Sequence, residues 1–157
     1  MFDKSELKRE LIARLREDLA TAEAAHRATV EGATHPEAKS EGDKDTRAIE
    51  QQYLARGQAE RVVSLRTQIA EVEAMELHPV TKSHTVALGT LVQATGESGL
   101  HTYFLVPSGG FTLRSGAVQV LSIHSPMGRS FIGAAVGEEV ELELGKQIRT
   151  YEIVAIE

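Results

Sequence analysis

The chain has 157 residues, a formal net charge of −6, and neither cysteine nor tryptophan. Without cysteine it can form no disulfide or thiolate metal site, and its acidic charge argues against unaided binding to a nucleic-acid backbone. Aromatic residues make up only 4% of the sequence, so a base-stacking platform is not expected either. No apolar stretch approaches the roughly 18 residues needed to span a bilayer, and the charged N-terminus lacks the apolar core of a secretory signal. We therefore expect a cytoplasmic protein with no membrane association and no DNA binding of its own.

The composition changes near residue 78. A dense mixture of Ala, Glu and Arg before this point is typical of long exposed helices, whereas Gly-punctuated runs of Val, Ile, Leu and Thr after it are typical of strands. The boundary contains Pro79, which a helix would not easily pass. We predict a helical hairpin over 1–78, a linker over 79–83 and a β-rich domain over 84–157. All the aspartates lie in the first half: Asp3, Asp18, Asp43 and Asp45.

Two segments of the first half have helical periodicity. Ser5 is a candidate N-cap for the first segment, and an apolar stripe follows it at helical spacing: Leu7, Leu11, Leu15, Leu19, Ala22 and His26. Gly32 and Pro36 then interrupt the pattern, which resumes around Ile49 and Tyr53. Further on, apolar residues step by three and four, the spacing of a coiled-coil seam: Val62, Leu65, Ile69 and Val72.

Each helix is apolar along a single stripe and must bury that stripe against a partner. The two helices could be half of a compact bundle, but the second half of the chain is predicted to form strands and supplies no further long helices. We therefore predict an antiparallel coiled coil with a tip loop near 33–46. At ~1.5 Å per residue, thirty helical residues give it a length of about 45 Å.

The second half is predicted to form a small α+β domain of antiparallel strands with one short helix. Ser125 and Pro126 fit the N-cap and first position of that helix, which carries Met127, Phe131 and Ile132, with both Phe131 and Ile132 expected in the core. Gly145-Lys146 is typical of a hairpin turn. The expected strands are Thr85–Thr95 (with a possible interruption at Gly89), His101–Val106, Val118–Ile123, Glu139–Leu144 and Ile148–Ile156.

The segment 124–133, His-Ser-Pro-Met-Gly-Arg-Ser-Phe-Ile-Gly, resembles the C-terminal signature of the GreA/GreB family of bacterial transcription factors. In that signature a strand ends in Ser-Pro, a short helix with a basic residue follows, and a Gly closes it. The acidic hairpin that comes next in the family corresponds here to 137–142, Gly-Glu-Glu-Val-Glu-Leu, and the final strand corresponds to 151–156. The order of elements also agrees, so the resemblance extends over nearly the whole chain, although residue identity is weak over 1–78.

The resemblance implies an FKBP-like C-terminal domain that docks at the rim of the RNA polymerase secondary channel while the hairpin enters it. Acidic tip residues then help to hold a second Mg²⁺ ion, and the polymerase cleaves backtracked RNA with its own active site. Such a factor is an accessory protein rather than an enzyme, binds Mg²⁺ only in the complex, and meets the RNA 3′ end only indirectly. It would act as a monomer. By the same resemblance we assign the docking contacts to Ser125, Pro126, Met127 and Arg129.

The tip departs from the family pattern. Cleaving members carry an acid, two intervening residues and then Glu-Asn, and this acid-x-x-Glu pair is missing here. Three carboxylates nevertheless lie close together beside a Gly, and they are the candidate catalytic residues: Asp43, Asp45 and Glu41. Asp43 and Asp45 are the candidate Mg²⁺ ligands, while Lys44 and Arg47 are candidate contacts to polymerase or RNA. Acids at this place are also common helix caps, which is an equally good reading of Asp45.

Three alternatives to a cleavage factor stay open. The chain could bind the polymerase channel and inhibit or modulate the enzyme without cleavage. An FKBP-like domain could instead be a prolyl isomerase, which would need an aromatic-lined apolar pocket. The hairpin could also be a scaffold that binds another coiled coil through the seam between Val62 and Val72.

Overall fold

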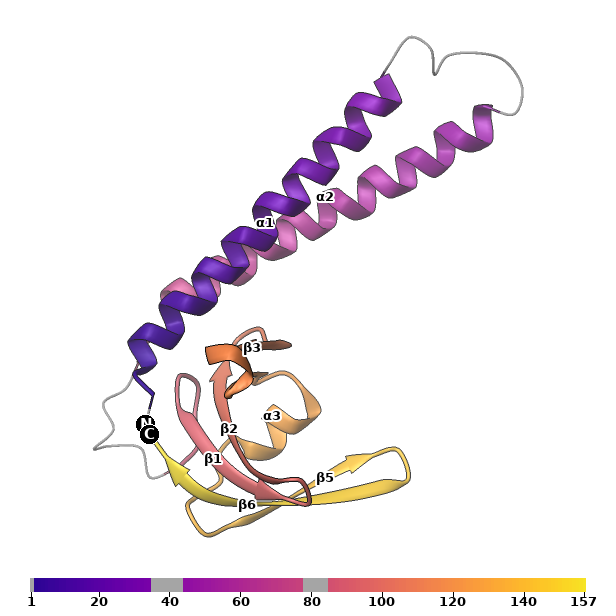
Figure 1. Cartoon of the computed structure of the whole chain (residues 1–157). Helices are drawn as coiled ribbons and strands as arrows, with labels where there is room; N and C mark the ends of the chain where they lie inside the picture. Colours follow the sequence, from indigo (N-terminus) through magenta and orange to yellow (C-terminus); the bar gives the residue numbers. More distant parts are fainter. Residues whose placement is uncertain (1, 35–43, 78–84) are drawn as a thin grey trace. The chain divides into compact units, whose positions relative to one another are not determined.

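The computed structural model describes residues 2–34, 44–77 and 85–157 (Figure 1). The chain divides into two compact units, one formed by Met1–Leu11 with Glu71–Glu157 and the other by Ile12–Ala70. The prediction of a helical hairpin followed by a mainly antiparallel sheet with a short helix is confirmed. The predicted linker over 79–83 lies outside the described residues.

The hairpin consists of α1 (Lys4–Thr34) and α2 (Lys44–Ala74). Asp3, and not the predicted Ser5, caps α1, because its Oδ1 accepts a hydrogen bond of 2.7 Å from the backbone N–H of Ser5. The sequence offers two capping residues here, two positions apart, and the helix begins two residues earlier than expected. In the described parts of the chain, no helix is both long and apolar enough to cross a membrane.

The predicted coiled-coil seam is confirmed in the proximal part of the hairpin, where both apolar stripes are buried: Leu7, Leu11, Leu15, Val62, Leu65, Ile69 and Val72. Ile49 and Tyr53, by contrast, are exposed and do not belong to the seam. Helical spacing alone misled the prediction there, because α2 carries apolar residues on more than one of its faces. Arg66 of α2 forms an ion pair of 2.6 Å with Glu23 of α1, which adds a polar tie between the helices.

A six-stranded sheet with the order β3-β4-β2-β1-β6-β5 forms the C-terminal part of the chain. Its strands are β1 (Leu91–Gly96), β2 (Gly99–Val106), β3 (Phe111–Leu113), β4 (Val118–Ser122), β5 (Glu139–Leu144) and β6 (Gln147–Ile156). The predicted interruption of the first strand at Gly89 is confirmed, since a turn separates β1 from Thr85, which forms only an isolated bridge to Ala135. The predicted hairpin at Gly145-Lys146 joins β5 to β6.

Two features of the sheet differ from the prediction. The three-residue strand β3 was not expected, because a segment this short has no readable alternation. β4 also pairs with β2 in parallel, not antiparallel as predicted. The parallel pairing follows from the position of β3: after β2 the chain passes to the edge of the sheet, forms β3, and turns back so that β4 fills the gap between β3 and β2.

The short helix α3 (Pro126–Phe131) packs against the sheet through Phe131, which is fully buried. The Phe131 ring makes edge contacts with Tyr103 and Tyr151, at centroid distances of 5.5 and 5.8 Å. Burial, and secondly the neighbouring Tyr151, raise the pKa of Tyr103 to about 12. This aromatic group forms the centre of the core with residues of β1, β2, β5 and β6 and of the segments before β1 and after α3: Val86, Val92, Ala94, Leu105, Ala134, Val140, Leu142 and Ile153.

The two edges of the sheet differ in kind. The edge strand β5 buries Val140 and Leu142 and exposes the glutamates that alternate with them, Glu139, Glu141 and Glu143. The opposite edge is β3, with only three residues. Alternation along β5 therefore gives the sheet a strongly acidic border on its outer face.

Candidate functional site

The turn that leads from β4 into α3 is held by a dense set of local hydrogen bonds. The hydroxyl of Ser125 donates to the carbonyl oxygen of Ser122 at 2.7 Å and accepts from the backbone N–H of Gly128 at 3.0 Å. Pro126 occupies the first turn of α3, where no backbone N–H is needed. The predicted capping role of Ser125 is confirmed, and it accounts for the Ser-Pro pair in structural terms.

Gly128 is required by the packing of α3 on the end of β4. A Cβ atom at this position would lie 2.0 Å from the carbonyl oxygen of Ser122 and 3.0 Å from the Cα of Ile123. Backbone atoms cannot move aside as a flexible side chain can, so no larger residue fits. The Ser-Pro-x-Gly sequence therefore allows α3 to pack unusually close to the end of β4.

The side of α3 that faces away from the core is exposed. We define the α3 surface as Pro126, Arg129, Ile132 and Val136, all exposed; Met127 is half-buried and packs against the core. The prediction that Ile132 belongs to the core is wrong: 42% of it is exposed, because the helix ends at Phe131 and the chain turns outward there. Arg129 donates a hydrogen bond to the carbonyl oxygen of His124, which holds its side chain along the turn.

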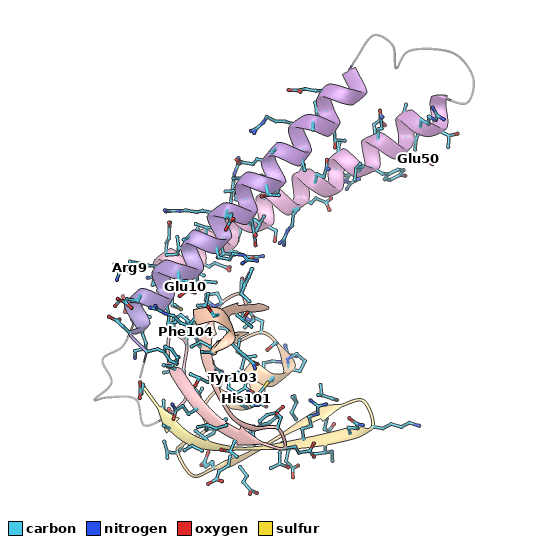
Figure 2. All side chains as sticks on the ribbon, viewed as in Figure 1. Arg9, Glu10, Glu50, His101, Tyr103 and Phe104 are labelled. Atoms are coloured by element: carbon cyan, nitrogen blue, oxygen red, sulfur yellow. The ribbon has the colours of Figure 1, made fainter. Side chains whose placement is uncertain are left out.

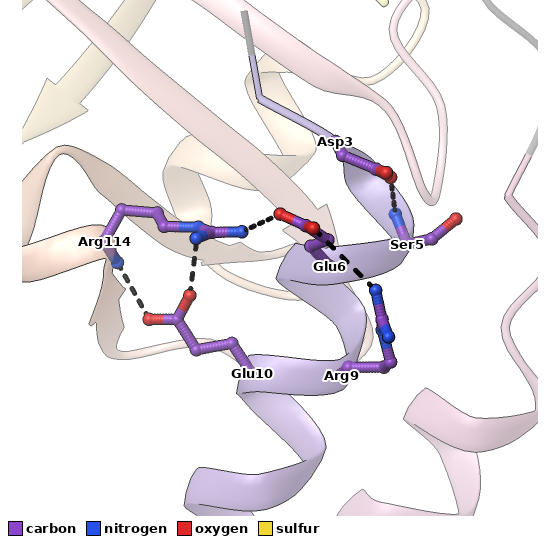
Figure 3. A network of polar contacts seen from close by, with 6 residues as sticks. All are labelled: Asp3, Ser5, Glu6, Arg9, Glu10 and Arg114. Carbon is purple, nitrogen blue, oxygen red and sulfur yellow. Dashed lines mark hydrogen bonds and ion pairs between the residues drawn. The ribbon is translucent and has the colours of Figure 1, made fainter.

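A second polar cluster, which the sequence did not suggest, ties the start of α1 to the connection between β3 and β4 (Figure 3). The guanidinium of Arg114 contacts Glu6 at 2.5 Å and Glu10 at 3.2 Å, and the Arg114 backbone N–H donates to Glu10 at 2.9 Å. Glu6 and Glu10 are four residues apart and therefore share one face of the helix. The only available sequence signal was this acidic pair, which is too common to identify a partner.

Arg114 adopts an unusual backbone conformation to make these contacts. Its φ is +52°, and that of the next residue, Ser115, is +55°. Left-handed backbone costs a non-glycine residue about 1–2 kcal/mol. The contacts to Glu6 and Glu10 offset part of this cost, so the loop is built to present Arg114 to α1.

The predicted tip residues are only partly covered by the structure. Glu41 and Asp43 lie outside the described residues. Lys44 and Asp45 have helical backbone at the start of α2, while their side chains are not described; Arg47 lies in the first turn of α2. The assignment of these carboxylates as metal ligands therefore stays a prediction. Among the described residues, no group of three His, Asp or Glu side chains is arranged to hold a metal ion.

The geometry bears on two of the alternative functions. Tyr103, Phe131 and Tyr151, which a prolyl isomerase would need to line an open pocket, are buried in the core instead. The seam from Val62 to Val72, which a scaffold would use to bind another coiled coil, is already covered within the chain. Neither feature favours these alternatives.

Comparison with known proteins agrees with the resemblance in the C-terminal half. The family model "Transcription elongation factor, GreA/GreB, C-term" matches residues 81–157. A relative, transcription elongation factor GreA of Methylobacterium nodulans, is 35% identical over 111 residues, covering 69% of this chain and 66% of the relative. The match thus spans slightly less than two thirds of that protein's length.

Similar solved structures include GreA factor homolog 1 (Gfh1) of Thermus thermophilus, at 18% identity, 97% coverage of this chain, 93% of that chain and a TM-score of 0.39. Another is a GreA/GreB factor from Nitrosomonas europaea, at 24% identity, 59% and 77% coverage and a TM-score of 0.38. Scores this low add no weight to the assignment, which rests on the family match and the sequence relative. On that basis, with the matched segment containing the whole sheet and the Ser-Pro-x-Gly turn, the chain belongs to the GreA/GreB family of transcription elongation factors.

Proposed function

We propose that this protein binds RNA polymerase through its C-terminal sheet domain and acts on transcription elongation by inserting the tip of its helical hairpin into the secondary channel. The observation that carries the proposal is the GreA/GreB C-terminal match over residues 81–157, a segment that contains the complete sheet and α3. In this role the protein is an accessory factor, and the chemistry belongs to the polymerase.

The α3 surface is the proposed docking contact. It combines exposed apolar side chains, Ile132 and Val136, with the cationic Arg129, and such a mixture suits a protein partner better than solvent alone. Ser125 and Met127 act by fixing the geometry of this surface, since their described contacts are within the domain, while the exposed Pro126 is part of the surface itself.

The tip is proposed to deliver carboxylates to the polymerase active site. Asp43, Asp45 and Glu41 supply oxygen atoms, the ligand type that Mg²⁺ prefers while it keeps several waters. A metal ion held by these carboxylates in the complex would supply activation of a bound water. Lys44 and Arg47 contribute positive charge beside these acids, suited to contacts with polymerase carboxylates or RNA phosphates.

One observation favours a second candidate, a channel-binding regulator that does not stimulate cleavage. The acid-x-x-Glu pair typical of cleaving family members is absent: residue 46, three after Asp43, is Thr, and residue 44, three after Glu41, is Lys. Both candidates share the docking step and differ only in what the tip does.

A backtracked elongation complex separates the two candidates. Addition of the protein with Mg²⁺ is expected to shorten the RNA, and the double variant Asp43→Asn/Asp45→Asn is expected to lose this activity while it still binds. Glu50→Gln is the matched control, since Glu50 is an exposed acid on the second turn of α2 (Figure 2). Binding without cleavage by the unmodified protein would favour the regulator, and an absence of binding would refute both.

The docking contact has its own test. Arg129→Glu on the α3 surface is expected to weaken polymerase binding at least tenfold, because a desolvated charge of the wrong sign is costly at an interface. Arg149→Glu, an equal charge reversal at an exposed position of β6, is expected to change binding little. Equal effects of the two variants would show that only net charge matters and would remove the α3 surface from the proposal.

A further inference from the structure

The seam between α1 and α2 changes character inside the unit Ile12–Ala70. Its proximal layers are apolar and at most 8% exposed: Leu15, Val62, Leu65 and Ile69. No residue from 16 to 32 or from 46 to 61 is buried. Apart from the half-buried Leu19, the positions that continue the seam are small or polar: Ala22, His26, Thr29, Ala55, Gln58 and Ala59. We call 26–34 and 44–61 the distal segment.

Polar atoms lie unpaired where the distal segment begins. Within the described part of the chain, Nδ1 of His26 and Oε1 of Gln58 are shielded from solvent but have no hydrogen-bond partner. Such an atom costs about 1–3 kcal/mol relative to a satisfied one. The side chains also leave a cleft of about 390 Å³ beside His26, with Ala59 and Val62 in its wall. The helices are thus poorly joined at this level, and Figure 1 shows them drawing apart from here toward the end of α1 and the start of α2.

The large apolar side chains of the distal segment do not compensate. Ile49, Leu54 and Tyr53 of α2 are each more than half exposed, with Tyr53 at 71%. They lie off the seam, so they stabilise neither helix against the other. An isolated helix shorter than ~15 residues is only marginally stable in water, and tertiary burial normally supplies the rest.

Gly57, in the middle of α2, weakens the segment further. A Cβ added there would meet no described atom within 4 Å, and the residue has no left-handed φ, so neither packing nor backbone conformation in the described structure requires glycine. Glycine in a helix interior costs roughly 0.5–1 kcal/mol relative to alanine. The weakness is therefore encoded in α2 itself as well as in the seam.

We infer that the distal segment is a separate unit of low stability, which opens and re-forms while the proximal seam from Leu15 to Ile69 stays folded. The polar layer of His26 and Gln58 marks the boundary between the two. The hairpin therefore combines a rigid proximal shaft with a distal end that adapts its helix spacing at little cost.

Hydrogen exchange of the free, full-length protein tests this inference without any partner. Local opening exposes amides with a free energy that exchange measures directly. Amides of residues 48–61 are expected to exchange at least tenfold faster than those of 62–72. Uniform exchange along α2, or slower exchange in 48–61, would overturn the inference.

Two sets of variants test the cause. His26→Leu/Gln58→Leu replaces the unpaired polar atoms with apolar seam residues, and Gly57→Ala restores helix propensity without touching the seam. Each is expected to slow exchange over 48–61 at least threefold and to leave 62–72 unchanged. Thr67→Ala is the matched control, because it raises helix propensity at an exposed position of the proximal part. An unchanged distal exchange in both sets of variants would remove the assigned cause.

The functional consequence rests on the proposed polymerase binding. In the complex, residues 48–61 are expected to gain protection, and Gly57→Ala is expected to shrink that gain because its free state is already more ordered. A protein that fails to bind polymerase would refute the proposed function and leave the free-state result intact. A protein that binds without added protection over 48–61 would refute the adaptive role alone.

Discussion

The C-terminal sheet and the distal segment of the hairpin differ in whether their glycine and polar residues have packing and hydrogen-bond partners. In the sheet, nearly every special residue has a structural partner: Gly128 lies against the Ser122 carbonyl, and Ser125 caps the helix that follows. In the distal segment, a Cβ at Gly57 would meet no described atom within 4 Å, and His26 leaves a shielded nitrogen without a described partner. The same residue type therefore signals tight construction in one region and looseness in the other, and only the surroundings distinguish them.

The strongest test of this contrast is Gly128→Ala. A methyl group 2.0 Å from a carbonyl oxygen forces α3 away from β4, and we expect a loss of about 3 kcal/mol or more of unfolding free energy, at the upper end for overpacking. Urea unfolding followed by circular dichroism measures it. Gly57→Ala provides the comparison and is expected to be neutral or slightly stabilising. If both substitutions proved harmless, the close approach of α3 would be refuted.

The next largest effect separates the two parts of α2. Leu65→Ala removes a fully buried side chain and is expected to cost about 2–4 kcal/mol. Leu54→Ala, the same chemical change at a position 55% exposed, is expected to cost less than about 0.5 kcal/mol. Thermal unfolding of the two variants side by side gives the answer. Similar costs at the two positions would mean that the distal segment is buried in solution.

Alkaline titration examines the aromatic core of the sheet. The pKa of Tyr103 is raised to about 12, so the unfolded chain releases this proton near pH 10 while the folded protein still holds it. The stabilisation is complete below pH 10 and is lost as the pH rises toward 12, by about 3 kcal/mol in all. Melting temperatures between pH 8 and 11 should fall more steeply for the unmodified protein than for Tyr103→Phe. Equal slopes for the two proteins would show that Tyr103 does not hold its proton more tightly in the folded state.

The smallest expected effect concerns Arg114. Arg114→Ala loses the contacts to Glu6 and Glu10 but keeps the left-handed backbone, whereas Arg114→Gly loses the contacts and relieves the strain. Since the three side chains are partly exposed, we expect the alanine variant to be destabilised by about 1 kcal/mol. The glycine variant should be more stable than the alanine variant by a similar amount. Equal melting temperatures would show that Arg114 is not strained in solution.

Much of the fold was predictable because turn-forming and capping residues occur at the ends of segments with clear strand or helix periodicity. The β5–β6 hairpin has both clean alternation and a Gly at the turn, and the start of α3 has both a capping Ser and a Pro. The misses have specific causes. β3 is too short to alternate, the parallel pairing of β4 depends on where β3 lies, and the left-handed Arg114 carries no glycine or asparagine to mark it.

The candidate sites were less predictable than the fold. Helical spacing placed Ile132 in the core because it follows Phe131, but the helix ends between them and the side chain faces outward. The cluster of Glu6, Glu10 and Arg114 joins residues far apart in the chain, which no local pattern reveals. The proposed roles of the tip acids Asp43 and Asp45 require a complex, so they depend on a surface that another protein would supply.

The unequal borders of the sheet have a consequence for how the domain behaves at high concentration. An edge strand offers unpaired N–H and C=O groups to any other chain, and hydrogen bonding between two such edges begins aggregation. Here β3 is too short to pair with a strand of another chain. A strand that paired with β5 would lie beside Glu139, Glu141 and Glu143. Two β5 edges approaching each other would bring like charges together, so the sheet resists extension into a second copy for as long as these carboxylates stay ionised.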